Sequence, residues 1–255
     1  MAIYEKPVKL LFRDMITDLS VQKGDVVGRE QINSWFTQKY PRIKPGTISA
    51  HLLKLSINAP SRIHYNVDPN GNDDLFFQID SKKFRLYDAT LDPDPIYSKP
   101  NGEEVRKGQL EDSKDENGNE FAYEKDLQNF LAKNLSLIEA GLSLHMEEEI
   151  SGIEFPVGNR FVDILATDKD NNYVVIELKV SRGYDRVVGQ ILRYMAWIRK
   201  NQADENQRVR GIIIAREISD DLLLACSETQ NVDLYEYNLS VSLNKIEKNV
   251  YRDRE

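Results

Sequence analysis

The chain has 255 residues, of which 40% are hydrophobic, and a formal net charge of −8. That length suits one large domain or two ordinary ones with a buried core. One cysteine and three widely spaced histidines argue against disulfides and structural zinc. The sequence has no apolar run of membrane-spanning length and no signal peptide, so we expect a cytoplasmic, prokaryotic protein without a membrane partner.

The charge is distributed unevenly along the sequence. Residues 1–90 have 13 Lys and Arg against 10 Asp and Glu, residues 91–120 have 4 against 9, and residues 121–255 have 17 against 23. The acidic excess therefore lies outside the first 90 residues. Such a charge predicts only modest nonspecific affinity for nucleic acid.

Residues 1–90 are predicted to form three helices and a β-hairpin. The first helix begins at Pro7, the second runs from Gly28 to near Tyr40, and the third starts at Thr47. Two apolar runs, 75–79 and 84–87, then flank a polar turn. This order resembles a winged helix-turn-helix, in which the third helix enters the major groove and the hairpin touches the DNA backbone.

The polar side of the third helix and the hairpin turn are the predicted DNA-contacting surfaces. The expected contacts are Lys44, Thr47, Ser49, His51 and Lys54 on the helix, with Lys82, Lys83 and Arg85 on the hairpin. Two alternatives stay open, because polar helix faces are commonly only solvated and many winged helices bind protein instead.

Residues 91–120 read as a tether between two domains. The segment opens with Asp92-Pro93-Asp94-Pro95, which breaks regular structure, and continues as a polar, acidic stretch with almost no apolar residues. Such a composition cannot bury enough surface to fold alone, so we expect a flexible linker.

Three charged residues interrupt two otherwise apolar strands in the C-terminal half. Asp163 lies in the predicted strand 161–166, and Glu177 and Lys179 lie in the strand 173–180. Alternating side chains place Glu177 and Lys179 on one face. If the strands pair as a hairpin across the turn 168–172, Asp163 meets Glu177.

Two carboxylates and an amine in one place suit phosphodiester hydrolysis. Carboxylates hold Mg²⁺, which lowers the pKa of a bound water and neutralises charge on the phosphate. A neighbouring lysine can position or deprotonate that water. The alternative is a salt-bridge cluster at the end of a sheet. A run of three glutamates, 147–149, is predicted to be a solvated edge instead.

Asp163 followed by Glu177-Leu178-Lys179 resembles the D…ExK core of the PD-(D/E)XK nucleases. Residues 121 to about 242 are similar to the nuclease domain of NucS-type (EndoMS-like) mismatch endonucleases. Further shared passages are 123–127, 134–135, 138–142 and 189–195. The resemblance implies a mixed α/β (α+β), restriction-endonuclease-like domain at 121–255 that uses Mg²⁺, for which Mn²⁺ can substitute.

The resemblance also implies roles for individual residues. The implied metal set is Asp163, Glu177, Leu178 and Glu124, with Lys179 and Gln190 as further catalytic residues. Glu124 shares the inward face of a predicted helix, where pairing with Arg193 or another helix residue is the alternative.

For a second predicted helix, from about 184 to 201, the resemblance implies that Gln190 and Tyr194 lie near the scissile phosphate. Gln190 and Tyr194 are four residues apart, so both can lean over the same spot; a packed tyrosine on a partly exposed helix is the alternative. Weaker candidates for phosphate contact are Arg182, Arg186 and Arg193.

Taken together, the sequence predicts a metal-dependent DNA endonuclease that cuts double-stranded DNA. An N-terminal part that differs from NucS-type enzymes favours a restriction-type enzyme, with sequence choice through the winged helix. Cutting both strands needs two sites, so a symmetric homodimer is expected. The alternatives are a mismatch-specific repair endonuclease, a DNA-binding regulator with an inactive nuclease fold, and an RNA-processing nuclease, for which stacking surfaces are not evident.

Overall fold

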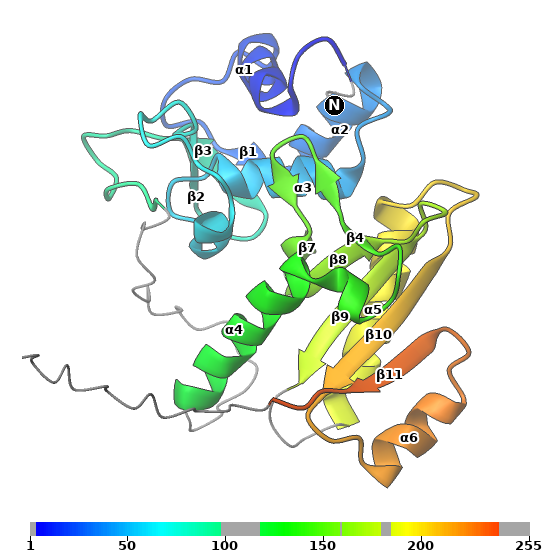
Figure 1. Ribbon diagram of the computed structural model, residues 1–255. Helices are drawn as coiled ribbons and strands as arrows, with labels where there is room; N and C mark the ends of the chain where they lie inside the picture. The colour runs from blue at the N-terminus through cyan, green and yellow to red at the C-terminus, as the bar shows by residue number, and fades with distance from the viewer. Residues whose placement is uncertain (1–3, 98–117, 159, 180–184, 240–255) are drawn as a thin grey trace, which may run out of the picture.

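The computed structural model describes residues 4–97, 118–158, 160–179 and 185–239, which form two lobes packed against each other (Figure 1). We call residues 4–97 the N-terminal lobe and residues 118–239 the C-terminal lobe. Most of the predicted linker, 98–117, lies outside the described residues. The first part of that linker packs on the N-terminal lobe, since the backbone N–H of Ile96 donates to the carbonyl of Ile57 at 2.8 Å. The predicted domain boundaries stay predictions.

The N-terminal lobe has the three predicted helices and the predicted hairpin. Its elements are α1 (Val8–Asp18), β1 (Val27–Gly28), α2 (Arg29–Lys39), α3 (Pro45–Lys54), η1 (Pro60–His64), β2 (Phe76–Gln78) and β3 (Lys83–Leu86). The strands form an antiparallel sheet in the order β1-β3-β2. Helix α1 buries Val8, Leu11, Phe12 and Met15, the spacing of one helical face. The winged-helix assignment stays a prediction.

The C-terminal lobe is built on one mixed sheet. Its elements are α4 (Gly118–Lys133), η2 (Leu135–Leu137), β4 (Ser143–Leu144), β5 (Met146–Glu147), β6 (Ile150–Ser151), β7 (Ile153–Val157), β8 (Arg160–Thr167), β9 (Tyr173–Lys179), α5 (Asp185–Asn201), β10 (Val209–Ala215), α6 (Asp220–Ser227) and β11 (Val232–Glu236). The sheet order is β11-β10-β9-β8-β4, with β7 also paired to β8. Strand β10 is parallel to both neighbours, whereas β8 and β9 are antiparallel. The mixed α/β fold predicted for this half is confirmed.

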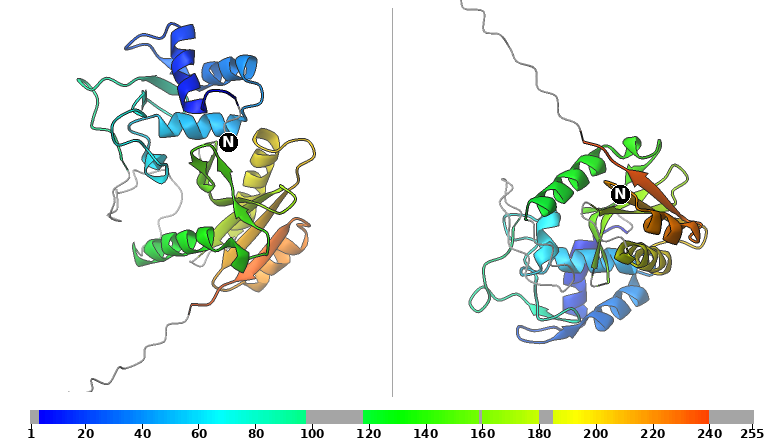
Figure 2. Two further views of the ribbon diagram at one scale, coloured as in Figure 1. Left: turned by 45° about the horizontal axis from the view of Figure 1, so that its top comes forward. Right: turned by 90° about the horizontal axis from the view of Figure 1, so that it is seen from below.

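Helices cover both faces of this sheet (Figure 2). Leu127 and Leu131 of α4 pack with Ile176 and its neighbours on one face. Helices α5 and α6 cover the other face, where Ile191 packs in one cluster with Val175. Ser219 caps α6 as predicted, accepting a hydrogen bond from the backbone N–H of Leu222 at 3.2 Å.

The two lobes share a continuous apolar core. Ala50 and Leu53 of α3, with Tyr65, belong to the same buried cluster as Ile150 and Phe155 of the C-terminal lobe. Burial of apolar surface in one cluster therefore holds α3 against β6 and β7. None of the described helices combines the length and hydropathy that a membrane span requires.

Candidate active site and the seam between the lobes

The paired strands β8 and β9 bring Asp163 and Glu177 together. Their ladder ends at the pair Ile164 and Ile176, and the next residue beyond each is one of the two acids. The backbone N–H of Leu178 donates to Asp163 Oδ2 at 2.7 Å, which ties the strands together past the end of the ladder. The predicted hairpin pairing is confirmed, and the two carboxylates lie at one end of it.

Helix α5 contributes Gln190, a neutral hydrogen-bond partner for Glu177. Val175 packs under α5, so Glu177 and Lys179, two and four residues later, face that helix. Gln190 Nε2 donates to Glu177 Oε1 and also to the hydroxyl of Tyr194, at 3.1 Å. Glu177 is only 5% exposed, and among the described residues its Oε2 finds no hydrogen-bond partner.

Burial and neighbouring negative charges both raise the pKa of the Asp163 and Glu177 carboxyl groups. Burial raises the pKa of Asp163, and the charges of Glu154 and Glu124 raise it further. Burial raises the pKa of Glu177 as well, followed by the charges of Asp163 and Glu124. The ammonium group of Lys179 opposes both shifts. The site therefore holds repelling carboxylates in a buried place, which a nearby positive charge would stabilise.

Two residues of this cluster were not predicted from the sequence. Gln128 Nε2 on α4 donates to the backbone carbonyl of Asp163 at 2.9 Å and to Glu154 Oε1 at 3.2 Å. Gln128 follows Glu124 by four residues, so helical spacing could have identified it. Glu154 lies on β7, and only the pairing of β7 with β8 brings it near Asp163.

The cluster suits a hard divalent cation with mixed ligands. Within the described ranges, no group of three or more His, Cys, Asp or Glu side chains is arranged to hold an ion alone. Mg²⁺, however, commonly takes one or two carboxylates and fills its other positions with water and substrate phosphate. Asp163 and Glu177, with the buried oxygen of Glu177 that lacks a partner, fit that donor set.

Comparison with known proteins adds to this geometry. Residues 123–245 match the family model described as the Endonuclease NucS C-terminal domain. The C-terminal lobe is a NucS-type endonuclease domain. Residues 7–86 match a domain family of unknown function, DUF7669.

The similarity to individual proteins is partial. Endonuclease NucS of Methanocaldococcus jannaschii is 33% identical over 96 residues, 38% of this chain and 34% of that protein. Endonuclease NucS of Pyrococcus abyssi is 32% identical over 97 residues, 38% of this chain and 35% of that protein. The chain thus spans about a third of the length of the curated relatives it matches.

Solved structures resemble the chain more distantly. A repair endonuclease from Pyrococcus abyssi has a TM-score of 0.37 at 24% identity, covering 50% of each chain. An EndoMS–dsDNA complex has a TM-score of 0.39 at 19% identity, covering 63% of this chain and 57% of the other.

The polar side chains of α3 are buried. Thr47, His51 and Lys54 meet glutamates of the NucS-type domain, and Ser49 accepts a hydrogen bond from Arg29 of its own lobe. Thr47, Ser49, His51 and Lys54 are all at most 8% exposed, and the side chain of Lys54 is fully buried. The expectation of an exposed face is therefore wrong. In this arrangement of the lobes, these four side chains are covered by protein and do not reach a DNA groove.

The three consecutive glutamates at the β5–β6 hairpin cover this face. Glu147 accepts a hydrogen bond from Thr47, and Glu149 forms an ion pair with Lys54. Glu148 Oε2 accepts from the backbone N–H of Val8, the first residue of α1, at 2.8 Å. The expected solvated edge is thus an interface, because its carboxylates meet cations and a helix N-terminus.

The other predicted DNA contacts differ in how accessible they are. Lys82 and Lys83 are exposed at the hairpin turn. Arg85 is paired with Asp92 and lies 4.3 Å from the ring centre of Phe77. Lys44 forms an ion pair with Asp204 across the seam between the lobes.

Helix α5 contains the remaining predicted contacts. Arg186 and Arg193 are exposed. Tyr194 is only 3% exposed, so its hydroxyl meets Gln190 and not open surface. Arg182 lies outside the described residues.

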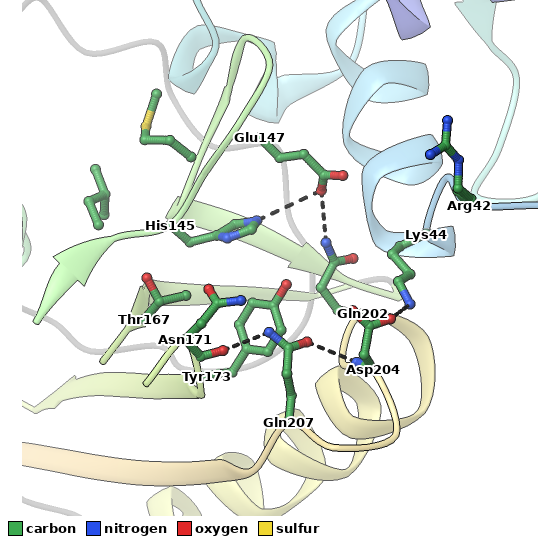
Figure 3. Close-up of a pocket in the computed structure, with 12 residues that line it drawn as sticks. Arg42, Lys44, His145, Glu147, Thr167, Asn171, Tyr173, Gln202, Asp204 and Gln207 are labelled. Carbon is green, nitrogen blue, oxygen red and sulfur yellow. Dashed lines mark hydrogen bonds and ion pairs between the residues drawn. The ribbon is translucent and has the colours of Figure 1, made fainter. Parts of the chain in front are cut away.

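A pocket of about 420 Å³ opens at the seam, at the turn end of β8 and β9 (Figure 3). Gln202, which lies in its wall, donates to Glu147 Oε2 at 2.9 Å. Among the described residues, the pocket lining includes Lys44 and Asp204 but neither Asp163 nor Glu177. The pocket is therefore separate from the carboxylate cluster.

Proposed function

We propose that this chain is a metal-dependent DNA endonuclease whose active site lies at Asp163, Glu177 and Lys179. The proposal rests on one observation: the buried carboxylate of Glu177 and the half-buried carboxylate of Asp163 lie together at the end of the β8–β9 ladder, on the NucS-type domain. The raised pKa of both carboxyls supports it, because a cluster that costs stability in the absence of a cation is typical of functional sites.

Each residue of the site has its own role in the proposed reaction. Asp163 and Glu177 would hold a divalent cation such as Mg²⁺, with Glu124 and the carbonyl of Leu178 nearby. Bound there, the cation would lower the pKa of a water and neutralise charge that develops on the phosphate. The ammonium group of Lys179 would orient the attacking water by donating a hydrogen bond to it.

Two residues of α5 act through Glu177. Gln190 holds one carboxylate oxygen of Glu177, which fixes the direction of the other oxygen. Tyr194 accepts a second hydrogen bond from the same amide group, so it orients Gln190. This pair of contacts keeps the site organised before the substrate arrives.

Double-stranded DNA is the proposed substrate, and repair-type cutting is the favoured specificity. The relatives that match residues of this domain are named Endonuclease NucS. The burial of Thr47, Ser49 and His51 removes the helix face on which a restriction-type readout depended. Cutting both strands requires two active sites, so we propose a symmetric homodimer.

The test uses supercoiled plasmid and short duplexes, with and without a mismatch, in Mg²⁺ or Mn²⁺. The wild type is expected to cut, whereas Glu177→Gln and Lys179→Ala should each lose about 100-fold or more in rate. Glu205→Gln, an equal charge change at an exposed site, should leave the rate unchanged. Wild-type protein that binds DNA and cuts none of these substrates would overturn the proposal in favour of a non-catalytic regulator.

A further inference from the structure

Glu154 is tied to the carboxylate cluster by a shared amide group. Gln128 Nε2 donates to Glu154 Oε1 at 3.2 Å and to the backbone carbonyl of Asp163 at 2.9 Å. Gln128 itself is buried on α4. One buried side chain therefore fixes the position of Glu154 relative to the strand that contains Asp163.

The backbone at Glu154 has an unusual conformation. Its φ is +50°, in the left-handed region that residues other than glycine, asparagine and aspartate seldom adopt. The strand changes face around it, since Ile153 packs on the α4 side of the sheet and Phe155 in the cluster under α5. Residues two apart in a regular strand would share a face. Such strain persists when the surrounding structure enforces it, and it is concentrated at functional sites.

The negative charge of Glu154 adds to those of the other carboxylates around Asp163 and Glu177. Among charged neighbours, Glu154 is the one that most raises the pKa of Asp163, and it also contributes to the raised pKa of Glu177. A glutamate with a purely structural role would be better placed away from other carboxylates. Glu154 nevertheless lies near Asp163, in a strained backbone conformation and in spite of electrostatic repulsion between the two carboxylates.

We propose that Glu154 is a further acidic residue of the cation site, held beside Asp163 by Gln128. The inference rests on the proposed function, because it assumes that a divalent cation binds at Asp163 and Glu177. The carboxylate of Glu154 binds that cation through one of its waters, since Asp163, Glu177 and Glu154 are not arranged to hold an ion directly as a group of three. It thereby increases the affinity of the site for a small divalent cation.

The test measures Mn²⁺ binding to the full chain without DNA, by titration calorimetry, together with the melting temperature in EDTA. Glu154→Gln should weaken Mn²⁺ binding by about 10- to 100-fold, the range found for residues that support metal ligands. Its melting temperature in EDTA should stay the same or rise, because one repelling charge is gone. Glu154→Gly should behave alike, since glycine adopts a positive φ without strain.

The control variants separate this inference from the proposed function. Glu205→Gln should bind Mn²⁺ like the wild type, and Asp163→Asn should bind it weakly. If Asp163→Asn weakens binding while Glu154→Gln and Glu154→Gly match the wild type, the role of Glu154 is overturned and the proposed function stands. A lower melting temperature with unchanged Mn²⁺ affinity would assign Glu154 a structural role. Absence of Mn²⁺ binding by the wild type would overturn both proposals.

Discussion

The carboxylate of Asp163 accepts a hydrogen bond from the backbone N–H of Leu178, with 2.7 Å between Oδ2 and the nitrogen. This contact replaces the next rung of the β8–β9 ladder, which stops at Ile164 and Ile176. A side chain thus does what a backbone carbonyl does elsewhere in the sheet. The consequence is that Asp163 is held at the position on β8 that faces Glu177.

Removing one of the two acids should stabilise the protein while it abolishes cleavage. Glu177→Gln keeps the shape and the acceptor for Gln190 but eliminates a buried charge beside Asp163. The free energy of unfolding in EDTA should increase by about 0.5–2 kcal/mol, as is common when function costs stability. Urea denaturation measures it, and a variant less stable than the wild type would contradict the repulsion inferred at this site.

Gln190 should affect the rate of the chemical step more than DNA binding. Gln190→Leu frees the carboxylate of Glu177 to rotate, so we expect kcat to fall by about 100-fold with KM little changed. Tyr194→Phe removes only the second contact of the amide group and should cost less. Steady-state kinetics on a fluorescent duplex measures both. A rise in KM with constant kcat would instead make Gln190 a DNA-binding residue.

Stability should fall as the pH drops from 6.5 to 4, because two histidines are buried in their neutral form. Burial lowers the pKa of His51 to about 4, despite a hydrogen bond to the Thr47 carbonyl and the nearby charge of Glu149. The charges of Lys54 and Lys9 lower it further. Burial likewise lowers the pKa of His145 to about 4.

The direction of this change in stability with pH follows from how many protons the folded and unfolded chains bind. Between the unfolded pKa of 6.5 and the folded pKa of about 4, the unfolded chain binds more protons than the folded one. Each histidine should therefore cost about 1.4 kcal/mol of unfolding free energy per pH unit within this window. Urea denaturation at pH 7, 6 and 5 tests this. His51→Gln should show a shallower dependence, and a flat profile for the wild type would contradict the prediction.

The hairpin turn and α3 should differ in their effect on DNA affinity. Lys82 and Lys83 are exposed, so alanine at each should reduce the slope of log affinity against log salt by about 1. Thr47→Ala should leave DNA affinity unchanged, because Thr47 is covered by Glu147. Fluorescence anisotropy at several salt concentrations measures both. Weaker DNA binding by a stable Thr47→Ala would show that the lobes separate on DNA.

Local patterns in the sequence predicted most of the secondary structure and the acid pair of the candidate site. The apolar spacing of α1 and the turn between β8 and β9 depend on residues close together in the chain, so they could be predicted without a fold. The strand alternation that places Glu177 and Lys179 on one face is equally local. The position of Asp163 beside the second strand could be predicted from the hairpin pairing of two neighbouring strands alone.

Contacts between distant segments could not be predicted in this way. The sequence shows that α3 has a polar side, but not what lies against it. The structure places Glu147 and Glu149 there, about a hundred residues further along the chain. Glu154 joins Asp163 only because β7 pairs with β8 and Gln128 of α4 reaches both. The sequence alone determined the elements and the acid pair on the β8–β9 hairpin, since spacing along a helix or strand dictates which side chains share a face. Only the tertiary structure decided which faces are covered and which further acid enters the site, because the partner of a buried charge is chosen by the packing of the whole chain.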